Sequence, residues 1–293
     1  MAELRDHTDI PPSVKRMIVN GVNLTYLEQG QGAPVVFLHG LATDHRIWES
    51  HYEAVARRHR CIALTQRYFG TDPWPDGGAN FSMKTHADDL AAFIHELHAG
   101  PVNLVGWSYG GAVALAVAVQ HPELVASLFT YELALATFVT DPADAQTAAD
   151  DRKEMTGPAA MAAKAGDHTE AVRLLMDGVS AQTGAFDALP PSVRSVMRDN
   201  ARMLPLQFTA PPPLPITGLQ LAQLKVPIAF ARGEQTRVFY KISTDTASRC
   251  ISGSRLIVIP KARHLWPFQD PAAFSDTLLG FLKDTDRLRV ANE

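Results

Sequence analysis

The sequence has few of the residues on which several classes of protein depend. Cysteine occurs only twice in 293 residues, at Cys61 and Cys250, and forms no C-x-x-C pair. A disulfide framework or a zinc site is therefore not expected. No apolar run approaches the roughly 18 residues that cross a bilayer, and the charged, proline-broken start at residues 1–12 shows no signal-peptide core. These absences predict a cytoplasmic protein with no membrane partner.

Clustered positive charge is also lacking. The chain has 27 Lys and Arg against 31 Asp and Glu, a formal net charge of −4, with no basic block that would attract nucleic acid. No P-loop, dinucleotide fingerprint or histidine-rich cluster is present, so we expect neither a cofactor nor a metal. Hydrophobic residues make up 46% of the chain, enough for a sizeable core. We expect a monomer or homodimer acting on a small-molecule substrate.

Short β-rich runs alternate with helical patterns along most of the chain. Asn20-Gly21 predicts a tight hairpin turn between two such runs. Apolar runs predict further strands at 35–38, 61–65, 102–105, 128–131, 226–231 and 255–259, and apolar spacing predicts helices at 85–98, 108–120 and 271–283. Strands that alternate with helices favour an α/β fold with a mostly parallel sheet covered on both faces.

The alternation stops between residues 136 and 222. This segment contains no convincing strand, is rich in Ala, Met, Asp and Gln, and nears its end in the stiff proline run Ala210–Pro215. We interpret 136–222 as a helical cap (lid), inserted after the sixth strand above the carboxyl edge of the sheet. Residues 1–135 and 223–293 then form the core.

The strongest chemical signal is the run Gly106-Trp-Ser-Tyr-Gly110, which matches G-x-S-x-G. It directly follows one predicted strand and precedes a predicted helix, the context in which this motif presents a serine nucleophile on a sharp turn. Ser108 is therefore the candidate nucleophile. A serine needs a base, and His264, in the loop after the last strand, lies in the required order along the chain. His39, next to a glycine turn and before Ser108, is interpreted as structural.

These motifs resemble those of the α/β-hydrolase superfamily over nearly the whole chain. His39-Gly40-Leu41 through Trp48 is similar to the family's oxyanion loop, and Arg67–Gly70 resembles its R-G-x-G turn, with Tyr68 in place of glycine. The resemblance implies an eight-stranded sheet and an oxyanion hole formed by the backbone N–H groups of Leu41 and Tyr109. It further implies a serine hydrolase that needs no cofactor.

The third member of the triad departs from the commonest family pattern. Thr236 occupies the place where many relatives carry Asp after the strand that follows the cap, and it cannot accept the charge. Glu132 ends the strand after the nucleophile helix, where zearalenone-type lactonases place their acid, and Glu234 is the rival candidate. A buried carboxylate at a strand end is costly without a partner such as an imidazolium, so we favour Glu132.

The surroundings of these residues suggest a substrate class. Trp107, Leu133 and Trp266 flank the catalytic positions, and Phe138 lies in the predicted cap, so these four are candidate substrate-binding residues. We expect hydrolysis of a medium-sized, largely apolar, uncharged carboxylic ester or lactone through an acyl-enzyme. The same triad could instead cleave a C–C bond or act as a perhydrolase, and a ligand-binding receptor of this fold with little turnover is the alternative from another class.

Overall fold

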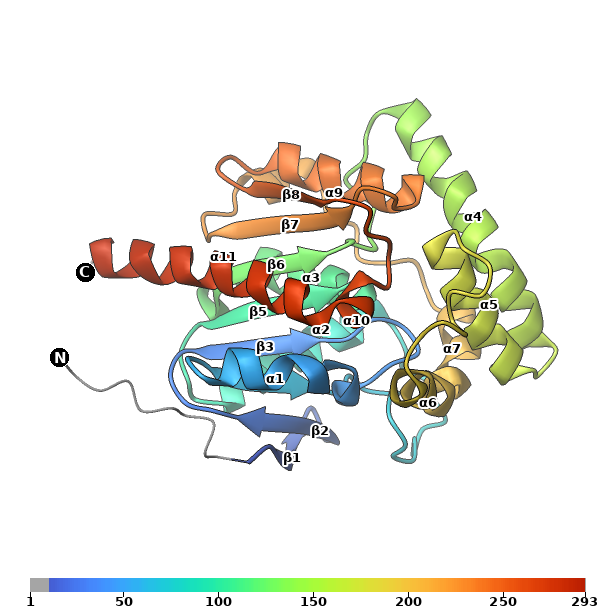
Figure 1. Ribbon diagram of the computed structural model, residues 1–293, viewed down its shortest axis with the longest axis horizontal. Helices are drawn as coiled ribbons and strands as arrows, with labels where there is room; N and C mark the ends of the chain where they lie inside the picture. Colours follow the sequence, from blue (N-terminus) through green and yellow to red (C-terminus); the bar gives the residue numbers. More distant parts are fainter. Residues whose placement is uncertain (1–10, 293) are drawn as a thin grey trace.

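The computed structural model describes residues 11–292 and is built on one eight-stranded sheet (Figure 1). The strand order is β1-β2-β4-β3-β5-β6-β7-β8, and only the β1–β2 and β2–β4 pairs are antiparallel. The strands are β1 (Ser13–Val19), β2 (Val22–Gln29), β3 (Pro34–Leu38), β4 (Arg60–Leu64), β5 (Val102–Trp107), β6 (Val125–Tyr131), β7 (Ile228–Gly233) and β8 (Arg255–Ile259). The predicted α/β-hydrolase fold with a mostly parallel sheet is confirmed.

Helices cover both faces of this sheet. Figure 1 shows α1 (Glu49–Ala56) and α11 (Pro271–Asn292) in front of it, with α2 (Met83–Glu96) and α3 (Tyr109–Gln120) behind. α9 (Val238–Cys250) packs against β7 and β8. The central strands β3, β5 and β7 are buried along their whole length, because helices exclude water from both of their faces.

Five helices separate β6 from β7 and lie beyond the carboxyl ends of the strands, on the right in Figure 1. They are α4 (Pro142–Lys164), α5 (His168–Ser180), α6 (Pro191–Asn200), α7 (Leu204–Thr209) and α8 (Gly218–Ala222). The helical segment therefore occupies the position expected for a cap. We retain 136–222 as its proposed bounds.

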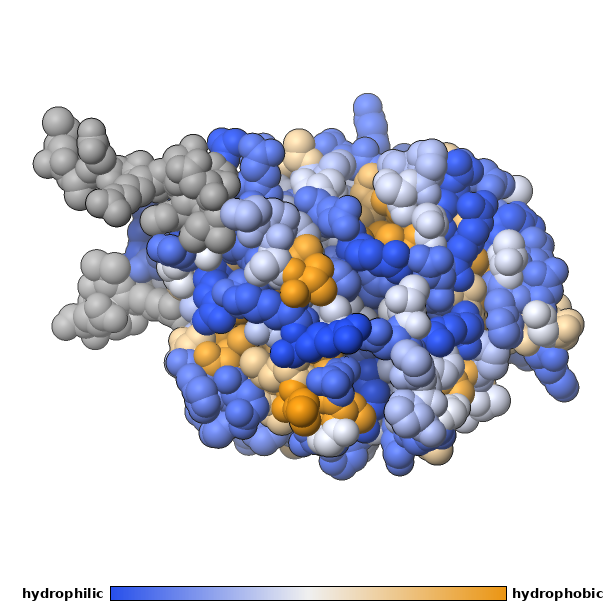
Figure 2. Space-filling model, turned by 90° about the horizontal axis from the view of Figure 1, so that it is seen from below, coloured by the Kyte–Doolittle hydropathy of each residue, from blue (hydrophilic) through white to orange (hydrophobic). Residues whose placement is uncertain are grey.

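The face of the molecule seen in Figure 2 is mostly hydrophilic, and its apolar residues form small separate patches. Over the described residues, the large apolar side chains that remain exposed include Val14 and Ile18 of β1 and Leu256 and Val258 of β8. No helix in this part of the chain is long and apolar enough to cross a membrane.

Three histidines lie in the core and are held in their neutral form. Burial lowers the pKa of His39 and His51 to about 4 and that of His86 to about 3. His39 Nε2 accepts a hydrogen bond from the Gln66 backbone N–H at 3.1 Å, the arrangement of a structural histidine. In the unfolded chain each ring takes up its proton near pH 6.5. The unfolded state therefore binds more protons between pH 6.5 and 4, and acid favours unfolding in that window.

We predict that the free energy of unfolding falls as the pH is lowered from 6.5 to 4, with each buried histidine contributing up to about 1.4 kcal/mol per pH unit. Urea denaturation of His51→Gln should show a shallower dependence on pH than the wild type, because one of these groups is removed. The matched control is His95→Gln, at an exposed position on α2. Equal slopes for the wild type and His51→Gln would contradict the prediction.

Candidate active site

The ends of three neighbouring parallel strands bring the candidate residues together. Trp107 of β5 is paired with Tyr131 of β6, and Tyr131 is paired with Ala231 of β7. Ser108 and Glu132 are the next residues along their strands, and the Ser108 backbone N–H donates to the Tyr131 carbonyl at 2.9 Å. Sites in such folds form at this carboxyl edge of the sheet. The strand register thus accounts for the proximity of these two residues.

Ser108 stands on a tight turn between β5 and α3. Its backbone has φ +55° and ψ −117°, a conformation that non-glycine residues rarely adopt. Close packing holds the turn: a Cβ on Gly106 would lie 2.5 Å from the Gly111 Cα, and one on Gly110 would lie 2.4 Å from the Leu38 carbonyl oxygen. The glycines of the motif are therefore required by the approach of α3 to the sheet.

Glu132 is fully buried and holds the His264 ring. Its Oε2 lies 2.7 Å from His264 Nδ1, and its Oε1 accepts a hydrogen bond from the Gly233 backbone N–H at 3.0 Å. Like Ser108, Glu132 has a positive φ, +51°, which marks a backbone constrained by its surroundings. Because the ionised carboxylate only accepts hydrogen bonds, Nδ1 carries the proton and Nε2 is left as the basic nitrogen.

The other acid candidate is engaged elsewhere. Glu234 is exposed, and its Oε2 accepts a hydrogen bond from the Lys261 backbone N–H at 2.9 Å. The structure therefore places Glu132, and not Glu234, against His264. Thr236, at the place where relatives carry Asp, has a buried hydroxyl with no protein partner among the described residues.

Two aromatic side chains fix the position of His264. Trp107 Nε1 donates to the His264 carbonyl oxygen at 3.1 Å. The ring of Tyr240, from α9, stacks on the imidazole with 4.3 Å between centroids and 18° between planes. Burial raises the pKa of the Tyr240 phenol above its ordinary value, and the neighbouring Ser108 hydroxyl lowers it in part. Sequence reasoning missed Tyr240, because the helix α9 that carries it was not predicted.

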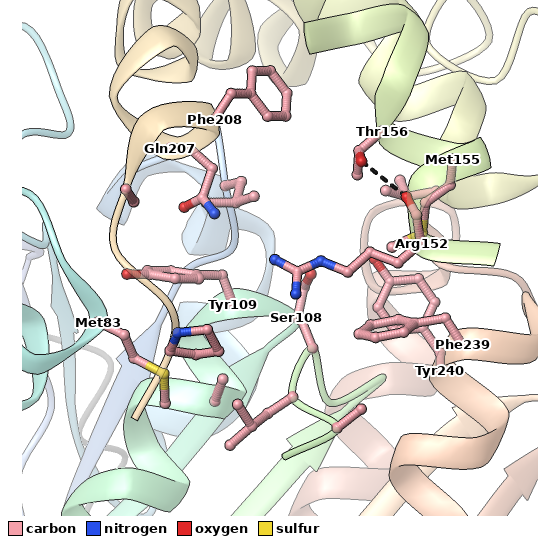
Figure 3. Close-up of a pocket in the computed structure, with 18 of the residues that line it drawn as sticks. Met83, Ser108, Tyr109, Arg152, Met155, Thr156, Gln207, Phe208, Phe239 and Tyr240 are labelled. Carbon is pink, nitrogen blue, oxygen red and sulfur yellow. Dashed lines mark hydrogen bonds between the residues drawn. The ribbon is translucent and has the colours of Figure 1, made fainter. Parts of the chain in front are cut away.

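A cavity of about 840 Å³ opens above Ser108 (Figure 3). Ser108, His264, Leu41 and Tyr109 all line it, so the candidate oxyanion donors share the cavity with the candidate nucleophile. The Tyr109 N–H belongs to the first turn of α3, where backbone N–H groups have no partner within the helix. Much of the remaining wall consists of small or apolar side chains from the cap and from α9: Ala145, Ala148, Ala149, Met155, Leu175, Met176, Phe208, Pro211, Pro212 and Phe239.

Of the four candidate substrate-binding residues, only Trp107 belongs to this lining. Leu133, Phe138 and Trp266 are buried in the hydrophobic core instead. The Trp266 ring packs 5.2 Å from Tyr131, centroid to centroid, because the loop after β8 turns it back toward the sheet. Nearness in sequence to a catalytic residue did not bring Leu133 and Trp266 to the cavity, and a place in the predicted cap did not bring Phe138 there, so we withdraw these three residues from the site.

No group of three or more His, Cys, Asp or Glu side chains is placed to hold a metal ion anywhere in the described residues. The nearest carboxylate to the histidine base is Glu132, and both of its oxygens are already engaged.

Helix α4 forms one wall of the cavity and is fastened to the core by a part-buried ion pair. Arg237, at the start of α9, places Nη2 2.6 Å from Asp151 and 2.9 Å from Glu154 of α4. Asp151 also accepts from the Phe239 backbone N–H at 3.0 Å. On the opposite side, Asn200 of α6 donates to Asp44 at 2.6 Å. The cap is thus held to the core at both sides of the cavity.

The fold and this site define a class of hydrolase, and comparison with known proteins gives the family. The family model described as alpha/beta hydrolase fold matches residues 33–271. The chain therefore belongs to the α/β-hydrolase family.

Individual relatives act on different substrates. A pimeloyl-[acyl-carrier protein] methyl ester esterase of Aeromonas hydrophila is 36% identical over 101 residues, which are 34% of this chain and 38% of that protein. A 2-(acetamidomethylene)succinate hydrolase of Mesorhizobium japonicum is 25% identical over 257 residues, 85% of this chain and 88% of that protein. The chain thus spans less than half of the esterase but most of the succinate hydrolase.

Solved structures show the same fold at lower identity. Est816, an N-acyl homoserine lactone degrading enzyme, aligns with a TM-score of 0.72 at 24% identity and covers 91% of this chain and 100% of its own. The carboxylesterase CesB from Bacillus subtilis aligns with a TM-score of 0.72 at 18% identity, over 94% of this chain and 93% of its own. At these identities the likeness establishes the fold alone.

We predict that Asp151→Asn lowers the free energy of unfolding by about 1.5–3 kcal/mol, because it weakens the charged hydrogen bonds to the part-buried Arg237 guanidinium. Urea denaturation measures the loss, and hydrogen exchange should be faster along α4. Asp150→Asn is the matched control, since Asp150 is the preceding residue of the same helix and is exposed. A loss of similar size in both variants would contradict the anchoring role.

Proposed function

We propose that this protein is a serine hydrolase that cleaves a carboxylic ester or lactone through Ser108, His264 and Glu132. The observation that carries the proposal is the 2.7 Å contact between Glu132 Oε2 and His264 Nδ1, formed by a buried pair whose ring shares the cavity with Ser108. A serine alone is a weak nucleophile, and a base oriented by a buried carboxylate is what activates it. Membership of the hydrolase family supports the same reaction class.

In the proposed mechanism, Ser108 Oγ attacks the carbonyl carbon while His264 Nε2 accepts the hydroxyl proton. Glu132 stabilises the imidazolium that forms and keeps Nδ1 protonated. His264 then returns the proton to the leaving alkoxide, which leaves an acyl-enzyme on Ser108. Water, deprotonated by the same nitrogen, releases the acid and restores the serine.

The tetrahedral intermediates require donors for their oxyanion, and we assign these to the backbone N–H groups of Leu41 and Tyr109. Each such donor typically contributes about 3–4 kcal/mol to transition-state stabilisation. The N-terminus of α3 adds a positive dipole end beside Ser108, where the negative charge develops.

The cavity supports a medium-sized, largely apolar substrate. Its volume of about 840 Å³ suits a small organic molecule, and most of its wall is formed by Ala, Met, Pro and Phe side chains. Similarity to a methyl ester esterase favours a carboxylic ester as the bond cleaved, and a lactone is a cyclic ester that the same attack would open.

We predict that a fluorophosphonate probe labels the wild type at Ser108 and that Ser108→Ala abolishes turnover of p-nitrophenyl butyrate, because the attacking oxygen is lost. Peptide mapping and the release of p-nitrophenol measure the two effects. Turnover retained in Ser108→Ala would overturn the assignment. If the probe labels the wild type but no ester is hydrolysed, C–C substrates and perhydrolysis become the next assays. If the probe does not label the wild type, a ligand-binding receptor is favoured.

We predict that Glu132→Gln lowers kcat for the same ester by about 10⁴-fold, as expected when a histidine loses the carboxylate that fixes its tautomer. Glu234→Gln should change kcat by less than about threefold, because surface substitutions away from the site have small effects. Circular dichroism checks that both variants fold. A large loss in Glu234→Gln with none in Glu132→Gln would transfer the role to Glu234.

A further inference from the structure

The cavity above Ser108 carries positive charge with no negative charge to balance it. Arg152 and Lys153, both on α4, belong to its lining, and no Asp or Glu does. Glu132, the carboxylate that contacts the lining residue His264, is already bound to His264 and to the Gly233 backbone. A ligand in this cavity is therefore exposed to a net positive field, although the sequence alone favoured an uncharged substrate.

Arg152 stands in a stripe of smaller side chains along α4. Most of the residues of α4 that line the cavity recur every three or four positions along one face of the helix, namely Ala145, Ala148, Ala149, Arg152, Met155, Thr156 and Ala160, and Lys153 and Gly157 lie at the edges of this face. The neighbouring alanines leave the guanidinium room to extend into the cavity. Figure 3 shows it directed inward, toward Ser108 and Tyr240, rather than away from the protein.

The acidic neighbours of Arg152 on α4 are occupied by another residue. Asp151 and Glu154 both pair with Arg237 of α9. Within the described residues, no carboxylate lies within the 4.0 Å of an ion pair from the Arg152 guanidinium. An arginine that points into a cavity with no partner there presents a charge that a ligand can satisfy.

A second polar group faces the same space from the other side of the cavity. Gln207, on α7, points inward in Figure 3, and its Oε1 is buried without a hydrogen-bond partner among the described residues. A buried amide oxygen that has no protein partner costs free energy unless a bound molecule or a water donates a hydrogen bond to it. Arg152 and Gln207 are thus two polar contacts in an otherwise mostly apolar cavity.

We propose that Arg152 binds a carboxylate carried by the substrate. The preferred substrates are then esters or lactones that also carry a free carboxylate, rather than neutral esters. The planar guanidinium can hold a carboxylate through two parallel hydrogen bonds, which orients the substrate as well as attracting it. The apolar middle of the substrate would then lie along the alanine stripe while its carbonyl reaches Ser108. This inference rests on the proposed function for the reaction and extends it to the substrate class.

The kinetic test compares two esters of similar length, p-nitrophenyl hydrogen glutarate and p-nitrophenyl valerate. The wild type should prefer the acid, and Arg152→Met should lower the ratio of kcat/KM for the acid to that for the neutral ester by about 10- to 100-fold, the range for a hydrogen bond to a charged group. Because Arg152 is solvent-exposed, the wild-type ratio should also fall as salt is added.

Lys164→Met is the matched control, since it removes the same charge from the last turn of the same helix outside the cavity. It should leave the ratio at the wild-type value. A wild-type preference for the neutral ester, or a ratio that Arg152→Met does not change, would overturn the proposal.

Binding separates this proposal from the proposed reaction. Calorimetry with Ser108→Ala, which cannot form an acyl-enzyme, should show tighter binding of monomethyl adipate than of dimethyl adipate. The difference should vanish in Ser108→Ala/Arg152→Met. If the wild type hydrolyses neither p-nitrophenyl ester, the ester-hydrolase proposal fails, while this binding comparison still decides the role of Arg152. Equal binding of the two adipates to Ser108→Ala would refute the carboxylate site.

Discussion

The site depends on one buried carboxylate. Glu132 has no exposure to water, and a carboxylate removed from water is strongly destabilised unless its charge is matched and its oxygens are bonded. Gly233 satisfies one oxygen and His264 the other, and these partners come from the ends of β7 and from the loop after β8. Burial of Glu132 therefore depends on three features. These are the pairing of β6 with β7, the absence of a side chain at Gly233, and the path of the loop after β8. A Cβ on Gly233 would lie 2.2 Å from the Ala262 carbonyl oxygen, so the loop itself requires glycine there.

Core and cap contribute to the site in different ways. Ser108, Glu132 and His264 lie at ends of core elements and are nearly excluded from solvent, which suits groups whose positions must not vary. Arg152 and Gln207 come from cap helices and face the cavity. Contacts across the core–cap junction hold these groups relative to one another, among them the Arg237 ion pair with α4 and the Asn200 hydrogen bond to Asp44. Displacement of α4 would therefore move Arg152 relative to Ser108 without disturbing the triad.

Sequence alone predicted the parts of this structure that follow local rules. The hairpin at Asn20-Gly21, the strand before Ser108 and the apolar helix after it carry their own turn and burial signals, and all three occur in the structure. The preference for Glu132 over Glu234 followed from the cost of a buried charge, and the geometry agrees with it. The sequence did not indicate α9 as a helix, because its many polar residues blur the apolar spacing. It also misplaced Leu133, Phe138 and Trp266, because neither nearness to a catalytic residue nor a place in the cap decides which way a side chain points.

Arg152 shows most clearly what sequence patterns omit. On α4, Asp151, Arg152 and Glu154 read as the charged face of a solvated helix, but residues one or two positions apart do not face each other on a helix, so neither acid is placed to pair with Arg152. In the structure the two acids pair with Arg237, a residue that lies more than 80 positions later in the chain, and Arg152 faces the cavity. Only the tertiary packing of α4 on α9 decides which of these charges is neutralised by the protein and which is presented to a ligand. Selectivity in such a fold can therefore change through the residues that hold a cap helix in place, while every residue of the triad stays the same.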